Sequence, residues 1–444
     1  MSNKAIKITI SVLLAAAIAA LSFMAGYLVK KCSTDKTIAS YEWALKTIKE
    51  NYYLCDPDES FTETSIKAMV AAHLDEYSEY YTKEEYAAVQ KSNAGSKSGV
   101  GVSYAYQSGR GIYISRVVGN SPAYKSGLRP GEWLISGSKE GVEVTFDSST
   151  AFSEFISSVS DGVQMTFTSE DGKSYSMAKS EYSASYTYLN TSTERWAVNP
   201  DSLSYEYSID YTYSCLPEGC AYLRLDQFYG TAATEFYKLV EKFNALNCTS
   251  LILDLRSNGG GYVSVMQDIA GCFADGSSKL AMLSRDKKGK EEAFNCKKIT
   301  KQERRVDKSV KVFVLANAGT ASASEALIGA MVCYGALEYE NIFLSEYDEA
   351  YIQWYYGGKE GKNARTFGKG IMQTPFTNSA TGEVLKLTTA KIFWPDKKTS
   401  IHDTGITAVS DGVTPACTAV PTSWEWTKGD SELRSAVETI KNRL

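Results

Sequence analysis

The feature that most constrains this chain is a regular alternation of strand-like and helix-like segments in its second half. Short apolar runs of strand length are followed, several times over, by longer runs with helical spacing of apolar residues. The strands are expected at 221–225, 250–255 and 310–316, and the helices at 231–245, 263–273 and 322–334. This succession predicts an α/β layer in which the loops after the strands carry the functional residues.

Length and charge narrow the class of protein. The chain has 444 residues, 22% of them charged, with a formal net charge of −5. Roughly three domains are expected for this length. The slightly acidic balance argues against a nucleic-acid partner, which normally requires a basic surface. Two histidines, His73 and His402, leave little material for a His-based metal site or a Ser-His-Asp triad. We therefore expect neither metal nor cofactor.

Two loops after predicted strands combine small residues with polar ones. The segment 254–261, Asp-Leu-Arg-Ser-Asn-Gly-Gly-Gly, follows an apolar strand, and its glycines can present bare amides to an oxyanion. A plain Gly-rich turn explains it equally well. The segment 317–325 places serines at the start of a helix, where amides and the helix dipole favour an anion. Helix capping by Ser322 or Ser324, with Glu325 in the first turn, is the commoner explanation of such a pattern.

The third loop, Phe-Gly-Lys-Gly-Ile-Met-Gln at 367–373, contains a lysine between glycines. Such a lysine is usually part of a turn. However, Lys369 and Gln373 are four residues apart, which puts them on one face of a strand or a helix. A lysine becomes a general base when burial lowers its pKa, and a neighbouring amide can orient it without adding charge.

The three loops together, in this order, resemble those of the carboxyl-terminal processing peptidases, which are serine peptidases with a Ser-Lys dyad. The family pattern matches residues 254–261, 320–325 and 366–373. The segment Leu-Asp-Glu-Tyr-Ser-Glu-Tyr at 74–80 is similar to the family's N-terminal signature, and residues 99–181 resemble its PDZ domain. In all, the resemblance covers residues 41 to about 410.

The resemblance implies a role for individual residues. Ser322 is the expected nucleophile, Lys369 the general base and Gln373 the residue that positions the lysine. The amides of Gly260 and Ala323 are the expected oxyanion donors. Ser324 is a second-choice nucleophile. In the PDZ domain, the backbone of Ser98, Gly99, Val100 and Gly101 is expected to hold a peptide carboxylate.

The implied fold is a multi-domain α/β protein: a crotonase/ClpP-like β/α peptidase core with an inserted PDZ domain, a helical N-terminal segment and one N-terminal membrane helix. The predicted divisions are a membrane helix (1–31), a helical region (32–92), the PDZ domain (93–181), a connecting arm (182–213), the peptidase core (214–425, with an insertion at about 340–363) and a C-terminal helix (426–444). The polar, Tyr-rich alternation of Tyr182–Tyr213 fits exposed strands or a connecting arm. The piece Tyr347–Asn363 is expected to be a surface insertion.

The N-terminus predicts membrane attachment. An uncharged run of 22 residues, from Ile8 to Val29, lies between lysines on both sides. It is long enough to cross a bilayer as a helix and exceeds the apolar core of a typical signal peptide. We expect a single-pass signal anchor with the catalytic part outside the cytoplasm; the alternative is a secreted protein whose leader is cleaved.

These expectations converge on a membrane-anchored serine endopeptidase that recognises protein substrates by their free C-termini. The first alternative is an inactive PDZ-containing adaptor with a decayed peptidase fold, and the second is a crotonase-like enzyme, for which no acyl-CoA site is visible. The sequence leaves open whether the protein forms a homo-oligomer.

Overall fold

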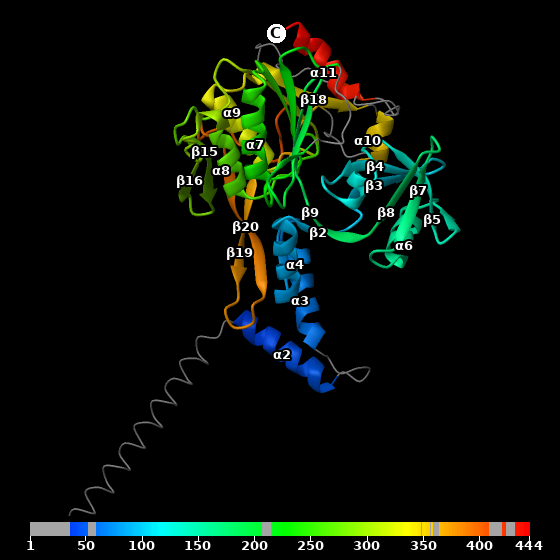
Figure 1. The fold of residues 1–444 in the computed structure, drawn as a ribbon. Helices are drawn as coiled ribbons and strands as arrows, with labels where there is room; N and C mark the ends of the chain where they lie inside the picture. Colours follow the sequence, from blue (N-terminus) through cyan, green and yellow to red (C-terminus); the bar gives the residue numbers. More distant parts are fainter. Residues whose placement is uncertain are drawn as a thin grey trace, which may run out of the picture. The chain divides into compact units, whose positions relative to one another are not determined.

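The computed structural model describes residues 36–51, 59–206, 215–347, 349–355, 357, 364–407, 420–422 and 431–444, in two compact units that divide after Leu74 (Figure 1). The first unit contains helices α2 (Lys36–Asn51) and α3 (Glu59–His73). The predicted membrane helix at 1–31 lies outside the described residues. Within the described ranges, no helix has the length and apolar character needed to cross a bilayer.

An eight-stranded sheet forms the centre of the second unit, in the order β12-β11-β10-β13-β14-β17-β18-β21. The strands from β13 onward are parallel, and β10 pairs antiparallel with β13. Their bounds are β10 Thr187–Asn190, β11 Arg195–Val198, β12 Tyr205–Glu206, β13 Cys220–Leu225, β14 Ser250–Asp254, β17 Lys311–Ala316, β18 Ile342–Tyr347 and β21 Val420–Thr422. The predicted α/β alternation is confirmed.

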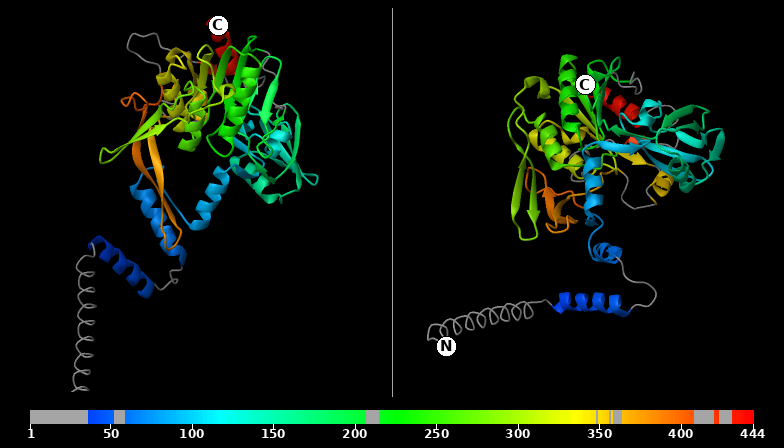
Figure 2. Two further views of the ribbon diagram at one scale, coloured as in Figure 1. Left: turned by 60° about the vertical axis from the view of Figure 1, so that its left-hand side comes forward. Right: turned by 60° about the horizontal axis from the view of Figure 1, so that its bottom comes forward.

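Helices cover both faces of this sheet, because its strands are apolar on both sides. In β14, Leu251 and Leu253 join the core under α7 (Ala232–Ala245), α8 (Val263–Gly271) and α9 (Ala323–Tyr334). The intervening Ile252 packs instead with α11 (Ser431–Lys441) on the opposite face. Figure 2 shows the same layers from two further directions.

The predicted connecting arm is part of this sheet. Its polar, Tyr-rich sequence suggested exposed strands, yet Leu189 and Val198 are completely buried. The reason is that β10 pairs along the edge of β13 and passes beneath α7, where every second residue faces the core. Residues 207–213 of the arm lie outside the described residues.

A second sheet lies beside the first and contains β1 (Glu79–Tyr81), β15 (Leu280–Asp286), β16 (Glu291–Asn295), β19 (Ile371–Thr377) and β20 (Val384–Phe393). β19 and β20 form a long antiparallel hairpin, orange in Figures 1 and 2. β1 pairs with β20 on the edge opposite β19. It interrupts a region that the sequence predicted as wholly helical. Helix α4 (Lys83–Asn93) follows β1 and begins with a capping box at Thr82.

Residues 100–178 form a module with its own core, where a PDZ domain was predicted. A six-stranded sheet is accompanied by α5 (Pro122–Lys125) and α6 (Ser149–Ser158). The strands are β3 Val102–Gln107, β4 Gly111–Val117, β5 Trp133–Lys139, β6 Val142–Thr145, β7 Gln164–Ser169 and β8 Ser174–Ala178. Strand β2 (Ser96–Gly99) precedes the module in the chain, and strand β9 (Ser180–Ser183) follows it. The two strands pair with each other.

The predicted insertion contains helix α10 (Glu349–Tyr355), which packs against this module. The Trp354 indole stacks on Trp133, with ring centroids 5.5 Å apart, and meets Tyr113 edge-on at 5.4 Å. Its Nε1–H donates to the Tyr106 carbonyl oxygen at 2.8 Å. Helix α10 is therefore in contact with the 100–178 module, and whether the rest of the insertion lies on the surface stays a prediction.

Candidate active site

The first predicted loop starts at Asp254, the buried last residue of β14. Its carboxylate accepts a hydrogen bond from the Tyr222 hydroxyl at 2.6 Å and lies 2.9 Å from Arg224 Nη1 and 2.6 Å from Arg256 Nη2. Burial acts to raise the pKa of Asp254, but the two guanidinium groups outweigh it and hold that pKa well below the usual range. Arg256 also pairs with Glu432 of α11. These contacts fix the point at which the loop leaves the sheet.

The first and second loops hold each other in place. The Asn317 side-chain oxygen accepts the backbone N–H groups of Ser257 at 2.8 Å and Gly319 at 3.0 Å. The Ala321 N–H donates to the Asn258 carbonyl at 2.9 Å. Residues about 60 positions apart thus form one rigid turn system at the carboxyl ends of β14 and β17.

Ser322 occupies the N-cap position of α9, but with an unusual backbone: φ is 57° and ψ is −114°. Ordinary N-cap residues have extended φ and ψ. A non-glycine residue held at a positive φ, as Ser322 is, costs about 1–3 kcal/mol of conformational free energy. Such strain is typical of nucleophiles held at the turn between a strand and a helix. Ser324 differs, because it is completely buried and its hydroxyl donates to the Asn258 carbonyl at 2.9 Å. The structure therefore favours Ser322 over Ser324.

Glu325 connects the second and third loops, a role that the sequence did not suggest. Its fully buried carboxylate accepts the N–H groups of Ser322 at 2.8 Å and Lys369 at 3.0 Å, both on the same oxygen, Oε2. Its other oxygen accepts the Gly368 N–H at 2.8 Å and the Thr366 hydroxyl at 2.5 Å. Burial raises the pKa of Glu325, and these hydrogen bonds act in the opposite direction. A capping glutamate three residues after the serine was the only signal in the sequence.

The backbone N–H groups of Lys369 and Ser322 are therefore close together, whereas the Lys369 side chain points to the Tyr77 ring. The ammonium nitrogen lies 4.5 Å from the centroid of the Tyr77 ring. Burial and the nearby positive charge of Lys386 lower the pKa of Lys369, and three acidic residues at 75–79 act against them. Among the described residues, no hydrogen bond joins the Ser322 hydroxyl to the Lys369 amine.

Gln373 lies on β19 next to a bulge in the ladder with β20. Its side-chain Nε2 donates to the Thr388 hydroxyl of β20 at 3.0 Å. In this arrangement the amide belongs to the β19–β20 sheet, and its predicted action on Lys369 stays a prediction.

The two predicted oxyanion donors meet at the start of α9. A Cβ atom on Gly260, where φ is +98°, would lie 2.9 Å from the Ala323 nitrogen and 2.9 Å from the Ser322 Cβ. Only glycine fits in this contact. The Gly260 N–H donates to Asn258 Oδ1 at 2.9 Å, so it would have to share its hydrogen with a substrate oxygen. The Ala323 N–H lies in the first turn of α9, where backbone N–H groups have no partner within the helix.

The four residues predicted to bind a peptide carboxylate form the entry to the 100–178 module. Ser98 and Gly99 are in β2 and pair with β9. The carbonyls of Val100 and Gly101 accept the N–H groups of Ala123 and Val118, both at 2.9 Å. The loop is thus anchored by its carbonyl groups immediately before the edge strand β3.

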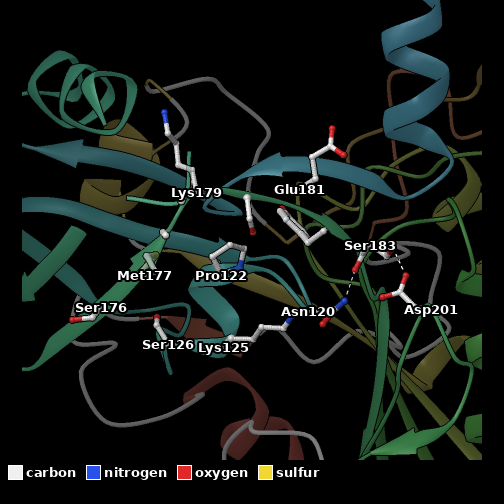
Figure 3. A pocket seen from close by; sticks show the side chains of 14 residues that line it. Asn120, Pro122, Lys125, Ser126, Ser176, Met177, Lys179, Glu181, Ser183 and Asp201 are labelled. Atoms are coloured by element: carbon white, nitrogen blue, oxygen red, sulfur yellow. Dashed lines mark hydrogen bonds between the residues drawn. The ribbon is translucent and has the colours of Figure 1, made fainter. Parts of the chain in front are cut away.

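A pocket of about 460 Å³ lies where β8 and β9 leave the module. Figure 3 shows its polar lining, in which Asn120 donates to the Ser183 carbonyl at 2.7 Å and Ser183 bonds to Asp201. Lys125 and Lys179 also line it. Ser322 and Lys369 do not, so this pocket is separate from the chemistry considered above.

Comparisons with known proteins find similarity to serine proteases. Residues 219–336 match the family described as "Peptidase family S41". A "Probable CtpA-like serine protease" of Staphylococcus epidermidis is 26% identical over 367 residues, covering 82% of this chain and 63% of that protein. The "C-terminal processing peptidase, chloroplastic" of Tetradesmus obliquus is 25% identical, over 78% of this chain and 67% of that protein.

A solved structure shares the fold. The putative S41 protease from Bacteroides fragilis has a TM-score of 0.50 and 15% identity, and the match covers 90% of this chain and 97% of that one. By contrast, the chain spans only 63% of the length of the staphylococcal relative.

Proposed function

Because this chain belongs to the carboxyl-terminal processing peptidases of family S41, we propose that it is a serine endopeptidase with Ser322 as nucleophile and Lys369 as general base. One observation carries the proposal. The backbone N–H groups of Ser322 and Lys369 donate to the same oxygen of the buried Glu325. Residues 47 positions apart in the chain are thereby held together at the N-terminus of α9.

In the proposed reaction, the Ser322 Oγ attacks the carbonyl carbon of a peptide bond while the neutral Lys369 amine takes its proton. The negative oxygen that develops is stabilised by the Ala323 N–H, by the Gly260 N–H and by the dipole of α9. The lysine then gives its proton to the departing amine as the C–N bond breaks. A water molecule, deprotonated by the same amine, then attacks the acyl carbon. The bond between that carbon and Ser322 Oγ breaks, and the lysine returns the proton to Oγ.

For this step the lysine amine has to leave the Tyr77 ring and reach the serine hydroxyl. Lys369 is only partly buried, and glycines precede and follow it in the chain. Contacts between catalytic groups are often long in a resting enzyme and shorten when substrate binds. The present arrangement is consistent with such a resting state.

We also propose that the 100–178 module is a PDZ domain that receives the C-terminus of a protein substrate. Support comes from β3, an edge strand of the module's sheet that follows directly on the Ser98–Gly101 loop. An extended peptide can add to such an edge.

The run Ile8–Val29 supports a membrane anchor with the catalytic part outside the cytoplasm. Fractionation of cells, followed by protease treatment of the intact cells, tests this location.

The test of the chemistry is degradation of casein by the full chain in detergent micelles. Loss of cleavage in Ser322→Ala and in Lys369→Ala, with retention in Ser324→Ala, is the expected result. Lys369→Arg should be as inactive as the alanine variant, because arginine stays protonated. Continued cleavage by Ser322→Ala refutes the mechanism.

The alternative is a PDZ-containing adaptor without activity. The same assay separates the two, provided that wild type is also treated with a fluorophosphonate probe. An adaptor leaves casein intact and Ser322 unlabelled, whereas a peptidase in a resting state labels slowly at Ser322 alone.

A further inference from the structure

The segment 75–81 is fastened along β20 by several independent contacts. β1, at its end, pairs with β20 in the register Glu79↔Lys386 to Tyr81↔Val384. Before β1, the Ser78 hydroxyl accepts the Thr388 N–H at 3.1 Å. The Asp75 carboxylate is hydrogen-bonded to the Thr388 side chain. Four residues of β20 are therefore in contact with one short segment from a distant part of the chain.

Two candidate site residues meet this segment. The Lys369 ammonium lies over the Tyr77 ring, 4.5 Å from its centroid. Gln373 donates to the Thr388 hydroxyl at 3.0 Å, and that hydroxyl is the one bonded to Asp75. Each of the two is held by a side chain of the segment, one directly and one through Thr388.

We propose that Tyr77 is a positioning residue for Lys369: its ring face binds the ammonium form and holds the lysine away from Ser322 until substrate arrives. The assignment of Lys369 as base rests on the function proposed above, whereas the contact between ring and ammonium does not. A cation over a tyrosine face is stabilised by the ring quadrupole, most strongly where water is partly excluded. Tyr77 is only partly exposed, so this condition is met.

The charges around Lys369 define what else can influence it. Lys386 on β20 disfavours a second positive charge, whereas Asp75, Glu76 and Glu79 favour it. The other titratable groups of the surroundings are the buried Glu325, bonded to the Lys369 backbone, His402, packed on Gly370, and Asp403, which acts on Tyr77. Substitution at Tyr77 changes none of these charges, but it removes the hydrogen bond between the Tyr77 hydroxyl and Glu76. Phe and Leu at position 77 both lack that bond, so a comparison of the two variants isolates the ring face.

Two substitutions separate the ring face from simple burial. Tyr77→Phe keeps the face and should leave the pKa of Lys369 within about 0.2 of wild type, because the quadrupole is retained. Tyr77→Leu keeps an apolar cover without a quadrupole, and should lower the pKa of Lys369 by about half to one pH unit. Lys386→Gln is a matched control with the opposite sign, because removal of a neighbouring positive charge should raise that pKa.

The measurement is a pH titration of ¹³C-dimethylated lysines by NMR on the full chain in micelles, with the Lys369 signal assigned by its loss in Lys369→Arg. Equal pKa values in wild type, Tyr77→Phe and Tyr77→Leu overturn the proposal, as does a rise in Tyr77→Leu. If Tyr77→Leu does not fold, Tyr77→Met takes its place with the same expected shift.

Activity supplies a second readout that a purely structural residue would not move. The acidic limb of kcat/KM against pH should shift to lower pH in Tyr77→Leu by the same amount as the NMR pKa, and should not move in Tyr77→Phe. A shifted NMR pKa in a protein that cleaves nothing supports the contact between ring and lysine and refutes the proposed function. An unshifted NMR pKa in a Tyr77→Leu enzyme that still cleaves casein refutes the role of the ring and supports the proposed function.

Discussion

Replacement of Glu325 by glutamine tests whether the buried carboxylate joins the two halves of the site. One oxygen, Oε2, accepts two backbone N–H groups, from Ser322 and Lys369. The other, Oε1, accepts the Gly368 N–H and the Thr366 hydroxyl. A glutamine keeps one oxygen and places an NH₂ group where the other was.

The better orientation keeps the oxygen toward Ser322 and Lys369, since the Thr366 hydroxyl can rotate to accept from the new NH₂. The Gly368 N–H then remains without an acceptor. One buried N–H left unpaired costs about 1–3 kcal/mol, so Glu325→Gln should lower the free energy of unfolding by about that amount. Because the loss falls on the backbone next to Lys369, activity should fall by at least about tenfold, as expected for a misplaced catalytic group.

Glu235 in α7 offers a matched control. It is equally buried, and its Oε2 accepts the N–H groups of Tyr186 and Thr187 and the hydroxyls of Ser185 and Thr187. Within the described part of the chain, its Oε1 accepts the Thr231 hydroxyl alone, at 2.5 Å. In Glu235→Gln the NH₂ can face that hydroxyl, so no N–H loses its acceptor. We expect less than about 1 kcal/mol of destabilisation, by urea unfolding, and unchanged casein cleavage.

The pair of variants can refute the reasoning in two ways. Equal losses of unfolding free energy in Glu325→Gln and Glu235→Gln would mean that the number of backbone N–H groups left unpaired does not determine the destabilisation. Full activity of Glu325→Gln, with the expected loss of stability, would mean that the shared carboxylate holds the fold without positioning the dyad.

Three further changes have defined outcomes. Asp254→Asn should cost up to about 3–5 kcal/mol at pH 7, because Arg224 and Arg256 lose the buried carboxylate that they share and are left with Asp226 and Glu432. Since the pKa of Asp254 is held below its usual range, its contribution is present above about pH 4 and lost as the pH falls through the folded-state pKa, so acid should narrow the difference from wild type. Trp354→Ala should release α10 and speed tryptic cleavage between residues 347 and 364 several-fold, whereas Trp354→Phe, which keeps an aromatic ring but not the bond to the Tyr106 carbonyl, should show a smaller effect. Gly260→Ala should abolish most casein cleavage, because its Cβ would meet the first turn of α9 at 2.9 Å with φ at +98°; Gly259→Ala, where nothing lies within 4 Å, should be active.

Each of these has a result that contradicts it. A constant difference between Asp254→Asn and wild type from pH 7 to pH 3 would show that the ion pairs do not stabilise the fold. Unchanged tryptic cleavage of Trp354→Ala would show that the Trp354 contact does not hold α10 against the module. Equal activity in the two glycine variants would show that the first loop does not approach α9 as described.

Much of the core followed from the sequence, because its signals are local. Continuous apolar runs mark strands buried on both faces, and the helices between them have apolar residues at helical spacing, so the order of elements from 221 to 334 was predictable. The sequence also placed Ser322 at a helix N-terminus and left Ser324 as an alternative. The burial of Ser324 argues against it as nucleophile, and that burial depends on the neighbouring loop at Asn258.

Other features depend on contacts between residues far apart in the chain. The Tyr-rich arm was predicted to form exposed strands or a connecting arm because its composition is polar, yet β10 is an inner strand of the central sheet and is covered by α7. No periodicity reveals that Glu325 accepts hydrogen bonds from residues 366–369, or that Tyr77 covers Lys369 from 292 positions away. The sequence by itself predicted which residues could carry the proposed chemistry. The tertiary structure decided which of them meet, because a hydrogen bond or a ring contact forms only where closure of the intervening chain brings its two partners within a few ångströms.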